Sequence, residues 1–279
     1  MTGRYLTTAA LRALEAKLTD HDLSVLHRVS CLRFVTGLQL TRLCFADSGD
    51  PAIDGRAARR ALLRLTRLGV VERLPRSIGG VRSGSSGFVY RLGPSGQRLA
   101  IAHGWQPEWR RRRSLVPGSL FLLHTLQVAE LYTRLIESER SQNVELLELS
   151  AEPSCWRTYD GPHAQREVLK PDSFVRLGIG AYEDSYFIEV DRGTEGSRAL
   201  DRQLAAYVAY HLSGQEQREH GVFPRVLWTA NTDERAGVIA ECVQRLPSDV
   251  RELFRVARFE TAVAIICQLP YDADDIMSS

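Results

Sequence analysis

Charge is divided unevenly along the chain, and this division constrains the fold more than any other feature of the sequence. Residues 1–115 carry 20 lysines and arginines against 8 aspartates and glutamates, whereas residues 116–279 carry 16 against 26. A basic half followed by an acidic half predicts two domains, the first of which faces a polyanion. The length of 279 residues is enough for two modest domains of ordinary globular composition.

The remaining composition excludes several classes of protein. No apolar run approaches the roughly 20 residues that cross a bilayer, and the N-terminal segment lacks the apolar core and cleavage site of a secretory signal. The five cysteines are scattered and contain no CxxC pair, so we expect neither a disulfide framework nor structural zinc. These features predict a cytoplasmic protein without membrane insertion.

Three helical segments are expected in the basic half. Thr19 with Asp22, and Thr36 with Gln39, have the spacing of capping boxes at the start of two helices. A third helix is expected over residues 54–69, with its apolar positions on one face. Its other face is basic, and we assign DNA contact to Arg56, Arg59, Arg60, Arg64 and Arg67.

After this helix the hydrophobic pattern changes to a strict alternation. Residues 70–74 and 87–92 have the pattern of two strands, joined by a Gly- and Ser-rich segment that carries Arg76 and Arg82. Three short helices followed by such a hairpin resemble a winged helix-turn-helix, whose third helix enters the major groove of DNA. We therefore expect residues 1–103 to bind double-stranded DNA. The alternative is a solvated, arginine-rich surface.

A run of four arginines lies between the two halves. Proline and glycine bracket it, so residues 104–118 are expected to form a basic linker, with residues 119–270 as the second domain and residues 271–279 as an acidic tail. A basic linker can follow phosphates without reading sequence, or it can be an ordinary surface run. The arginines concerned are Arg110, Arg111, Arg112 and Arg113.

The acidic half has the pattern of a mixed α/β domain. Its expected order is helix, strand, strand, strand, helix, strand, helix, strand, which predicts a mixed sheet covered by helices. The chain is therefore expected to have two domains, the first of the α+β class and the second of the α/β class. Helices are expected at 119–139, 197–212 and 233–246, and strands at 144–149, 168–177, 185–191, 224–229 and 255–266.

Carboxylates interrupt the apolar strands of this domain. Asp172 lies inside the expected second strand, and Glu189 and Asp191 share one face at the end of the third. Neighbouring carboxylates repel each other, a cost that is usually tolerated where a cation needs them. The three would form an oxygen-rich pocket for a hard divalent cation, Mg²⁺ or Mn²⁺. The alternative places all three at strand ends that face solvent.

These residues resemble the motif of the PD-(D/E)xK nucleases. Pro171-Asp172 is followed after 16 residues by Glu189-x-Asp191, on the αβββαβ order that such nucleases share. Gln203 and Tyr207 on the next helix are similar to the QxxxY motif of RecB-like members, and Glu130 matches the acidic residue that many members supply from the first helix. With the winged helix-turn-helix, the chain resembles the replication-relaxation family, which is related to the MOB-C class of plasmid relaxases.

The sequence departs from the nuclease motif at its lysine. That position holds Asp191, whereas Lys170, one of only two lysines in the chain, directly precedes Pro171-Asp172. Lys170 would share a strand face with Asp172 and could replace the missing cation. Alternatively, Asp191 is a further metal ligand, or the domain is an inactive nuclease core kept for binding.

The resemblance implies a metal-dependent protein that nicks DNA at a transfer or replication origin of a mobile element. Asp172 and Glu189 would hold the metal, and Glu130 or Asp191 would complete its shell. Lys170 and Gln203 would orient the attacking water or the phosphate. The alternative is a non-catalytic origin-binding regulator or accessory. The expected partners are origin-type double-stranded DNA, transfer or replication machinery, and a second copy in a homodimer.

Overall fold

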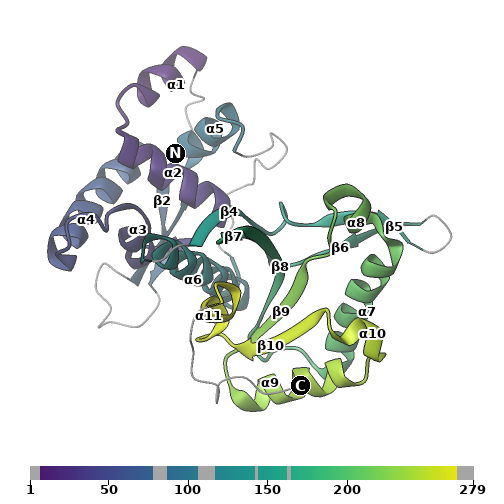
Figure 1. The fold of residues 1–279 in the computed structure, drawn as a ribbon. Helices are drawn as coiled ribbons and strands as arrows, with labels where there is room; N and C mark the ends of the chain where they lie inside the picture. Colours follow the sequence, from purple (N-terminus) through teal and green to yellow (C-terminus); the bar gives the residue numbers. More distant parts are fainter. Residues whose placement is uncertain (1–6, 78–86, 106–116, 142–143, 162–164, 269–279) are drawn as a thin grey trace. The chain divides into compact units, whose positions relative to one another are not determined.

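The computed structural model describes residues 7–77, 87–105, 117–141, 144–161 and 165–268 (Figure 1). The chain divides into two compact units, Met1–Thr133 and Arg134–Ser279, so the long helix α6 (Ser119–Ser141) contributes to both. The expected domain limits at residues 103 and 118 stay a prediction. Arg82, the four linker arginines at 110–113 and the acidic tail lie outside the described residues.

The first unit contains helices and a small antiparallel sheet, with strands in the order β1-β3-β2. The expected helices and hairpin are confirmed as elements, and β1 joins the hairpin as a third strand. Before α6, the unit consists of α1 (Thr8–Glu15), α2 (Asp20–Leu32), β1 (Val35–Thr36), α3 (Gly37–Cys44), α4 (Pro51–Arg67), β2 (Val71–Ser77), β3 (Phe88–Leu92) and α5 (Pro94–Ala102).

Local capping fixes where the helices of this unit begin. Both predicted capping boxes are present, at Thr19 for α2 and at Thr36 for α3. The predicted start of α4 is wrong by three residues, because Asp50 caps the helix by accepting a hydrogen bond from the backbone N–H of Ala52 at 2.7 Å. Pro51 favours this earlier start, because a proline has no backbone N–H and the first helical position offers no acceptor for one within the helix.

The second unit is built around a five-stranded sheet with the order β10-β9-β8-β7-β4 (Figure 1). Strands β4, β7 and β8 are antiparallel, whereas β8, β9 and β10 are parallel. After α6, its elements are β4 (Val144–Ala151), β5 (Arg157–Asp160), β6 (Arg166–Leu169), β7 (Ser173–Ile179), β8 (Tyr182–Asp191), α7 (Ser197–Ser213), α8 (Gln215–His220), β9 (Arg225–Ala230), α9 (Asp233–Gln244), α10 (Ser248–Arg251), β10 (Phe254–Arg258) and α11 (Ala262–Ile266).

The mixed α/β class is confirmed, but two predicted strands are wrong in detail. The strand expected at 168–177 is divided into β6 and β7 by residues 170–172, so Asp172 precedes β7 and does not lie within a strand. Pro171 has no N–H to donate to a neighbouring strand, which favours the break. The strand expected at 255–266 ends at Arg258, and its apolar remainder forms α11, because a short apolar run fits a buried helical turn equally well.

Helices α7 and α9 cover the face of the sheet that carries the candidate residues. The core between them is aromatic, and the ring of Tyr207 on α7 packs edge-to-face on Trp228 of β9 and tilted on Phe187 of β8. All three side chains are almost completely buried. This core fixes α7 over the end of β8, where Glu189 and Asp191 lie.

Candidate active site

Asp172 and Glu189 are brought together by the register of β7 and β8. Ser173 pairs with Ile188, so the residues before and after them, Asp172 and Glu189, are neighbours across the two strands. The backbone N–H of Val190 donates to Oδ2 of Asp172 at 2.7 Å, which fixes that carboxylate. The negative charge of Asp172 acts on Glu189, so the two carboxyl groups form an interacting pair.

Burial makes the charged form of Glu189 unfavourable. The residue is only 7% exposed. Burial, then the negative charge of Asp172, raise the pKa of Glu189 well above its usual value, and the more distant Glu195 adds to this effect. The hydroxyl of Tyr207 donates to Oε1 of Glu189 at 2.6 Å and opposes the shift only in part. A cation at this position would reverse the balance, because it stabilises both carboxylates.

Helix α7 supplies the neighbours of this carboxyl pair. Burial and the adjacent Glu189 raise the pKa of Tyr207 well above its usual value, so its hydroxyl remains a donor. Gln203 lies one helical turn earlier and is half-buried. Its side-chain amide forms no hydrogen bond with any residue that the structure describes, so it is available to a ligand.

Asp191 shares the strand face of Glu189, as predicted, but its charge is already balanced. Arg235 of α9 forms two hydrogen bonds to it, with Nε at 2.8 Å from Oδ1 and Nη2 at 2.6 Å from Oδ2. The N–H of Gly193 also donates to Oδ1, at 2.5 Å. The sequence analysis did not identify Arg235 as a site residue, although the order of the elements could have indicated it. Strands β8 and β9 are parallel, so the helix that follows β9 begins beside the end of β8.

Lys170 lies outside the strand on which its predicted role depended. Its ammonium nitrogen is 5.0 Å from the ring centroid of Trp156, and the side chain is exposed. The pleat that would have placed Lys170 and Asp172 on one face ends at the break between β6 and β7. Beside this break, the buried thiol of Cys155 donates to the carbonyl of Pro171 at 3.0 Å. Cys155 is a further neighbour that the sequence did not indicate.

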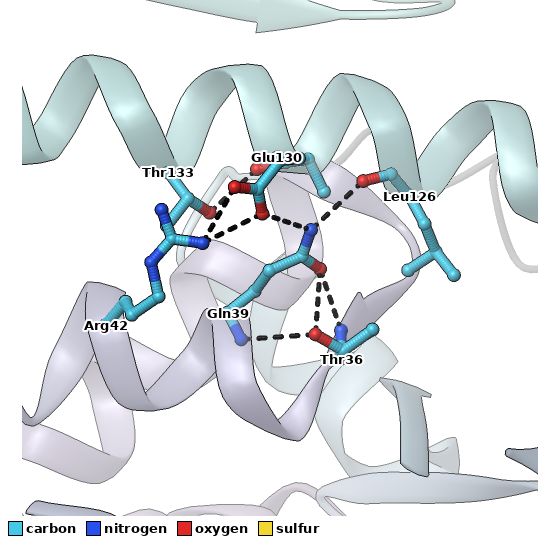
Figure 2. Close-up of polar contacts among 7 residues, drawn as sticks. Thr36, Gln39, Arg42, Leu126, Glu130 and Thr133 are labelled. Atoms are coloured by element: carbon cyan, nitrogen blue, oxygen red, sulfur yellow. Dashed lines mark hydrogen bonds and ion pairs between the residues drawn. The ribbon is translucent and has the colours of Figure 1, made fainter. Parts of the chain in front are cut away.

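Glu130 lies in the first unit, where it anchors α6 to α3 (Figure 2). Nη1 of Arg42 is 2.8 and 2.9 Å from the two oxygens of Glu130. Gln39 Nε2 donates to Oε2 of Glu130 at 3.1 Å and to the carbonyl of Leu126 at 3.0 Å. Because both oxygens of Glu130 have partners, a role as metal ligand would require these bonds to be replaced.

The carboxylates therefore do not form one closed metal cage. In the parts of the chain that the structure describes, no three or more His, Cys, Asp or Glu side chains are grouped to hold a metal ion. The neighbouring carboxyl groups of Asp172 and Glu189 offer hard oxygen ligands for an open site. Divalent magnesium commonly binds through one or two carboxylates and takes its other ligands from water and phosphate.

The arginine face of α4 is exposed, but one of its members has a structural partner. Arg64 Nη2 lies 2.6 and 2.5 Å from the two carboxylate oxygens of Asp22, whose side chain is fully buried. The others have no ion pair or hydrogen bond to a residue that the structure describes, and they present their charge to solvent. These are Arg56, Arg59, Arg60 and Arg67. Arg76 lies in β2, but its side chain is outside the described part.

Comparison with known proteins indicates the family of the chain. A family model described as Replication-relaxation matches residues 26–226, which include α2 to α4, the carboxyl pair and Tyr207. No curated protein and no solved structure matches the chain. No helix among the described residues is long and apolar enough to cross a membrane.

Proposed function

The chain belongs to the replication-relaxation family, and from this premise we propose that it binds DNA at an origin of a mobile element and nicks it in a metal-dependent reaction. Membership of the family indicates a role in the replication or relaxation of mobile elements. The site residues, the bound metal and the DNA contacts given below are our proposal.

The adjacent carboxyl groups of Asp172 and Glu189, each held by a hydrogen-bond donor, are the observation that carries the proposal. Burying Glu189 beside the carboxylate of Asp172 opposes folding when no cation is bound, because Glu189 keeps a proton that it would lose in water. Glu189 lies at the end of β8, and Tyr207 fixes its orientation from α7. A site that lowers folding stability, and whose two carboxyl groups are nevertheless each held by a hydrogen-bond donor, is typical of a functional centre.

Mg²⁺ or Mn²⁺ fits this pair, because both carboxyl groups offer the oxygen ligands that these ions prefer. When bound, such an ion lowers the pKa of a water ligand and neutralises charge on the scissile phosphate. The chain's own residues prepare the site. Val190 N–H orients Asp172, Tyr207 orients Glu189, and the proton that Glu189 holds leaves to solvent when this group ionises.

Gln203 is proposed to orient the phosphate or the attacking water. Its free amide lies one turn from Tyr207 on α7, on the same side of the helix. Asp191 is proposed to position Arg235, whose guanidinium adds positive charge to the end of β8, close to where the nuclease motif has its lysine. On this basis, Asp191 is a positioning residue and the metal shell consists of Asp172, Glu189, water and phosphate. A metal-ligand role for Glu130 stays a prediction.

We assign DNA binding to the first unit. Helices α2, α3 and α4 with the sheet β1-β3-β2 have the element order of a winged helix-turn-helix, in which α4 would be the recognition helix. Its exposed arginines match the phosphate backbone in charge. The order α6, β4, β7, β8, α7, β9 in turn supports a PD-(D/E)xK-like core, into which the β5–β6 hairpin is inserted.

One observation favours the non-catalytic alternative. The motif's lysine position is occupied by Asp191, and the positive charge nearest to it, on Arg235, is used by that aspartate. A domain of this kind could bind an origin and recruit another nuclease without cleaving DNA itself.

The test is a nicking assay on supercoiled plasmid carrying the protein's own origin, in Mg²⁺, Mn²⁺ or EDTA. We expect nicked circles in either metal and none in EDTA, with Asp172→Asn inactive but still bound to DNA in a gel shift. Glu145→Gln removes an exposed carboxylate from the same sheet and serves as the matched control. Binding without nicking in either metal would favour the regulator, and an active Asp172→Asn variant would refute the assigned site.

A further inference from the structure

We propose that the exposed face of the β5–β6 hairpin binds an unpaired base of single-stranded DNA beside the Asp172–Glu189 pair, with Trp156 as the stacking surface and Lys170 as the phosphate contact. The inference rests on the proposed function, because it names the form of DNA that the candidate site receives.

The hairpin has one face that is anchored and one that is free. Tyr159 and Leu169 are 3% exposed and belong to the core under α7. On the same face, the guanidinium of Arg157 lies 4.9 Å from the ring centroid of Phe174 and 3.3 Å from the buried carboxylate of Glu216. These contacts hold the hairpin rigidly against the domain, so its other face is presented in a fixed position.

The free face combines an aromatic ring with positive charge. Arg157 pairs with Leu169, so Trp156 and Lys170 lie opposite each other just beyond that pair. Trp156 is 37% exposed and Val168 on the same face is 42% exposed, which leaves an apolar surface in water. A large exposed aromatic side chain beside a cation is the arrangement that single-strand-binding proteins use for successive bases and phosphates.

The contact between Lys170 and Trp156 does not prevent stacking. A cation–π contact at an exposed position is weaker than the stacking of a base on an aromatic ring. A base can therefore take the place of the ammonium group, which then reaches the adjacent phosphate. The other charged residues on this face are Arg166 and Asp160, which are register partners across the hairpin and have opposite charges. Lys170 therefore gives the face its net positive charge.

Trp156 and Lys170 both lie next to the candidate site, each through its own segment of the chain. Lys170 is two residues before Asp172, and Trp156 follows Cys155, whose thiol donates to the carbonyl of Pro171 at 3.0 Å. Burial raises the pKa of that thiol, and the negative charges of Asp172 and Glu189 add to this effect. A base on Trp156 would thus hold its strand beside the carboxyl pair. A single strand is the expected occupant, because bases in a duplex are already stacked on each other.

The test measures the affinity of the full chain for a labelled single-stranded oligonucleotide and for the matching duplex, by fluorescence anisotropy. Arg56, Arg60 and Arg67 are replaced by alanine in every variant, so that binding through α4 does not hide the effect. Trp156→Ala should weaken single-strand binding roughly tenfold, whereas Trp156→Phe should retain most of it. Tyr182→Ala, which removes an exposed aromatic side chain at the start of β8, should have no effect.

Lys170→Gln gives a second measurement that does not depend on the ring. It should weaken binding and flatten the dependence of log K on log salt by about 0.7, the value for one phosphate contact on a single strand. Equal single-strand affinity for Trp156→Ala and its parent, or no measurable single-strand binding by the parent, would overturn the inference, as would an equal loss for the duplex. These outcomes are separate from the nicking result, because Asp172→Asn tests cleavage and Trp156→Ala tests binding.

Discussion

Replacing Glu189 with glutamine should stabilise the second unit near neutral pH. Burial and the charge of Asp172 raise the pKa of Glu189 well above 4.5, its usual value, so the folded protein holds a proton there that the unfolded chain releases. Glutamine keeps the local hydrogen bonds. Its oxygen can accept from the hydroxyl of Tyr207, and its amide can donate to the neighbouring carboxylate of Asp172.

The sign and the size of the effect follow from proton linkage. A carboxyl group with a raised pKa in the folded state binds more protons folded than unfolded, so stability is lost as the pH rises above its unfolded pKa. Each pH unit between the unfolded and folded pKa values costs about 1.4 kcal/mol, which sets a ceiling of about 4 kcal/mol at pH 7.5. The interaction with the charge of Asp172 and relaxation of the site reduce the expected gain to about 1–3 kcal/mol. Near pH 4.5 the gain should vanish.

Native-state hydrogen exchange of the β8 and β9 amides measures the opening free energy of the second unit alone. Wild type, Glu189→Gln and the control Glu145→Gln would be compared at about pH 5 and pH 7.5 in EDTA. The exposed side chain of Glu145 should give no comparable gain. A Glu189→Gln variant that is less stable than wild type at pH 7.5, or a gain that is equal at both pH values, would refute the reasoning.

Three further outcomes are expected. First, replacing three exposed arginines of α4 with alanine, namely Arg56, Arg60 and Arg67, should weaken duplex binding. The slope of log K against log salt should fall by about 0.9 for each lost phosphate contact. Arg12→Ala on α1 is the control, and an unchanged slope in the triple variant would contradict the assignment. Arg64→Ala should cost about 1–2 kcal/mol in thermal unfolding, less than a fully buried pair because Arg64 is 43% exposed, and Arg64→Lys should restore part of it. Tyr207→Phe removes the hydroxyl donor that favours the ionised form of Glu189. It should therefore weaken Mn²⁺ binding in calorimetry while the second unit stays folded. Undiminished Mn²⁺ binding would exclude a positioning role for Tyr207.

Local features of this protein could be predicted from the sequence because their causes are local. The capping boxes of α2 and α3 involve residues three positions apart, and both form as predicted. The alternation that puts Glu189 and Asp191 on one strand face also needs only neighbouring residues. The break between β6 and β7 was missed although Pro171 indicated it, because the apolar residues on either side had the pattern of one continuous strand.

Only the tertiary structure decided the partners of the charged residues. Arg42 and Glu130 are 88 residues apart, and Arg235 and Asp191 are 44 apart, so each pair exists because two elements happen to pack together. The same holds for Arg64, whose guanidinium pairs with a buried aspartate on α2 while its neighbours on α4 remain exposed. Composition and spacing show which side chains carry charge. Which of them is neutralised depends on the packing of distant segments, because ion pairs form over a few ångströms in space regardless of separation along the chain.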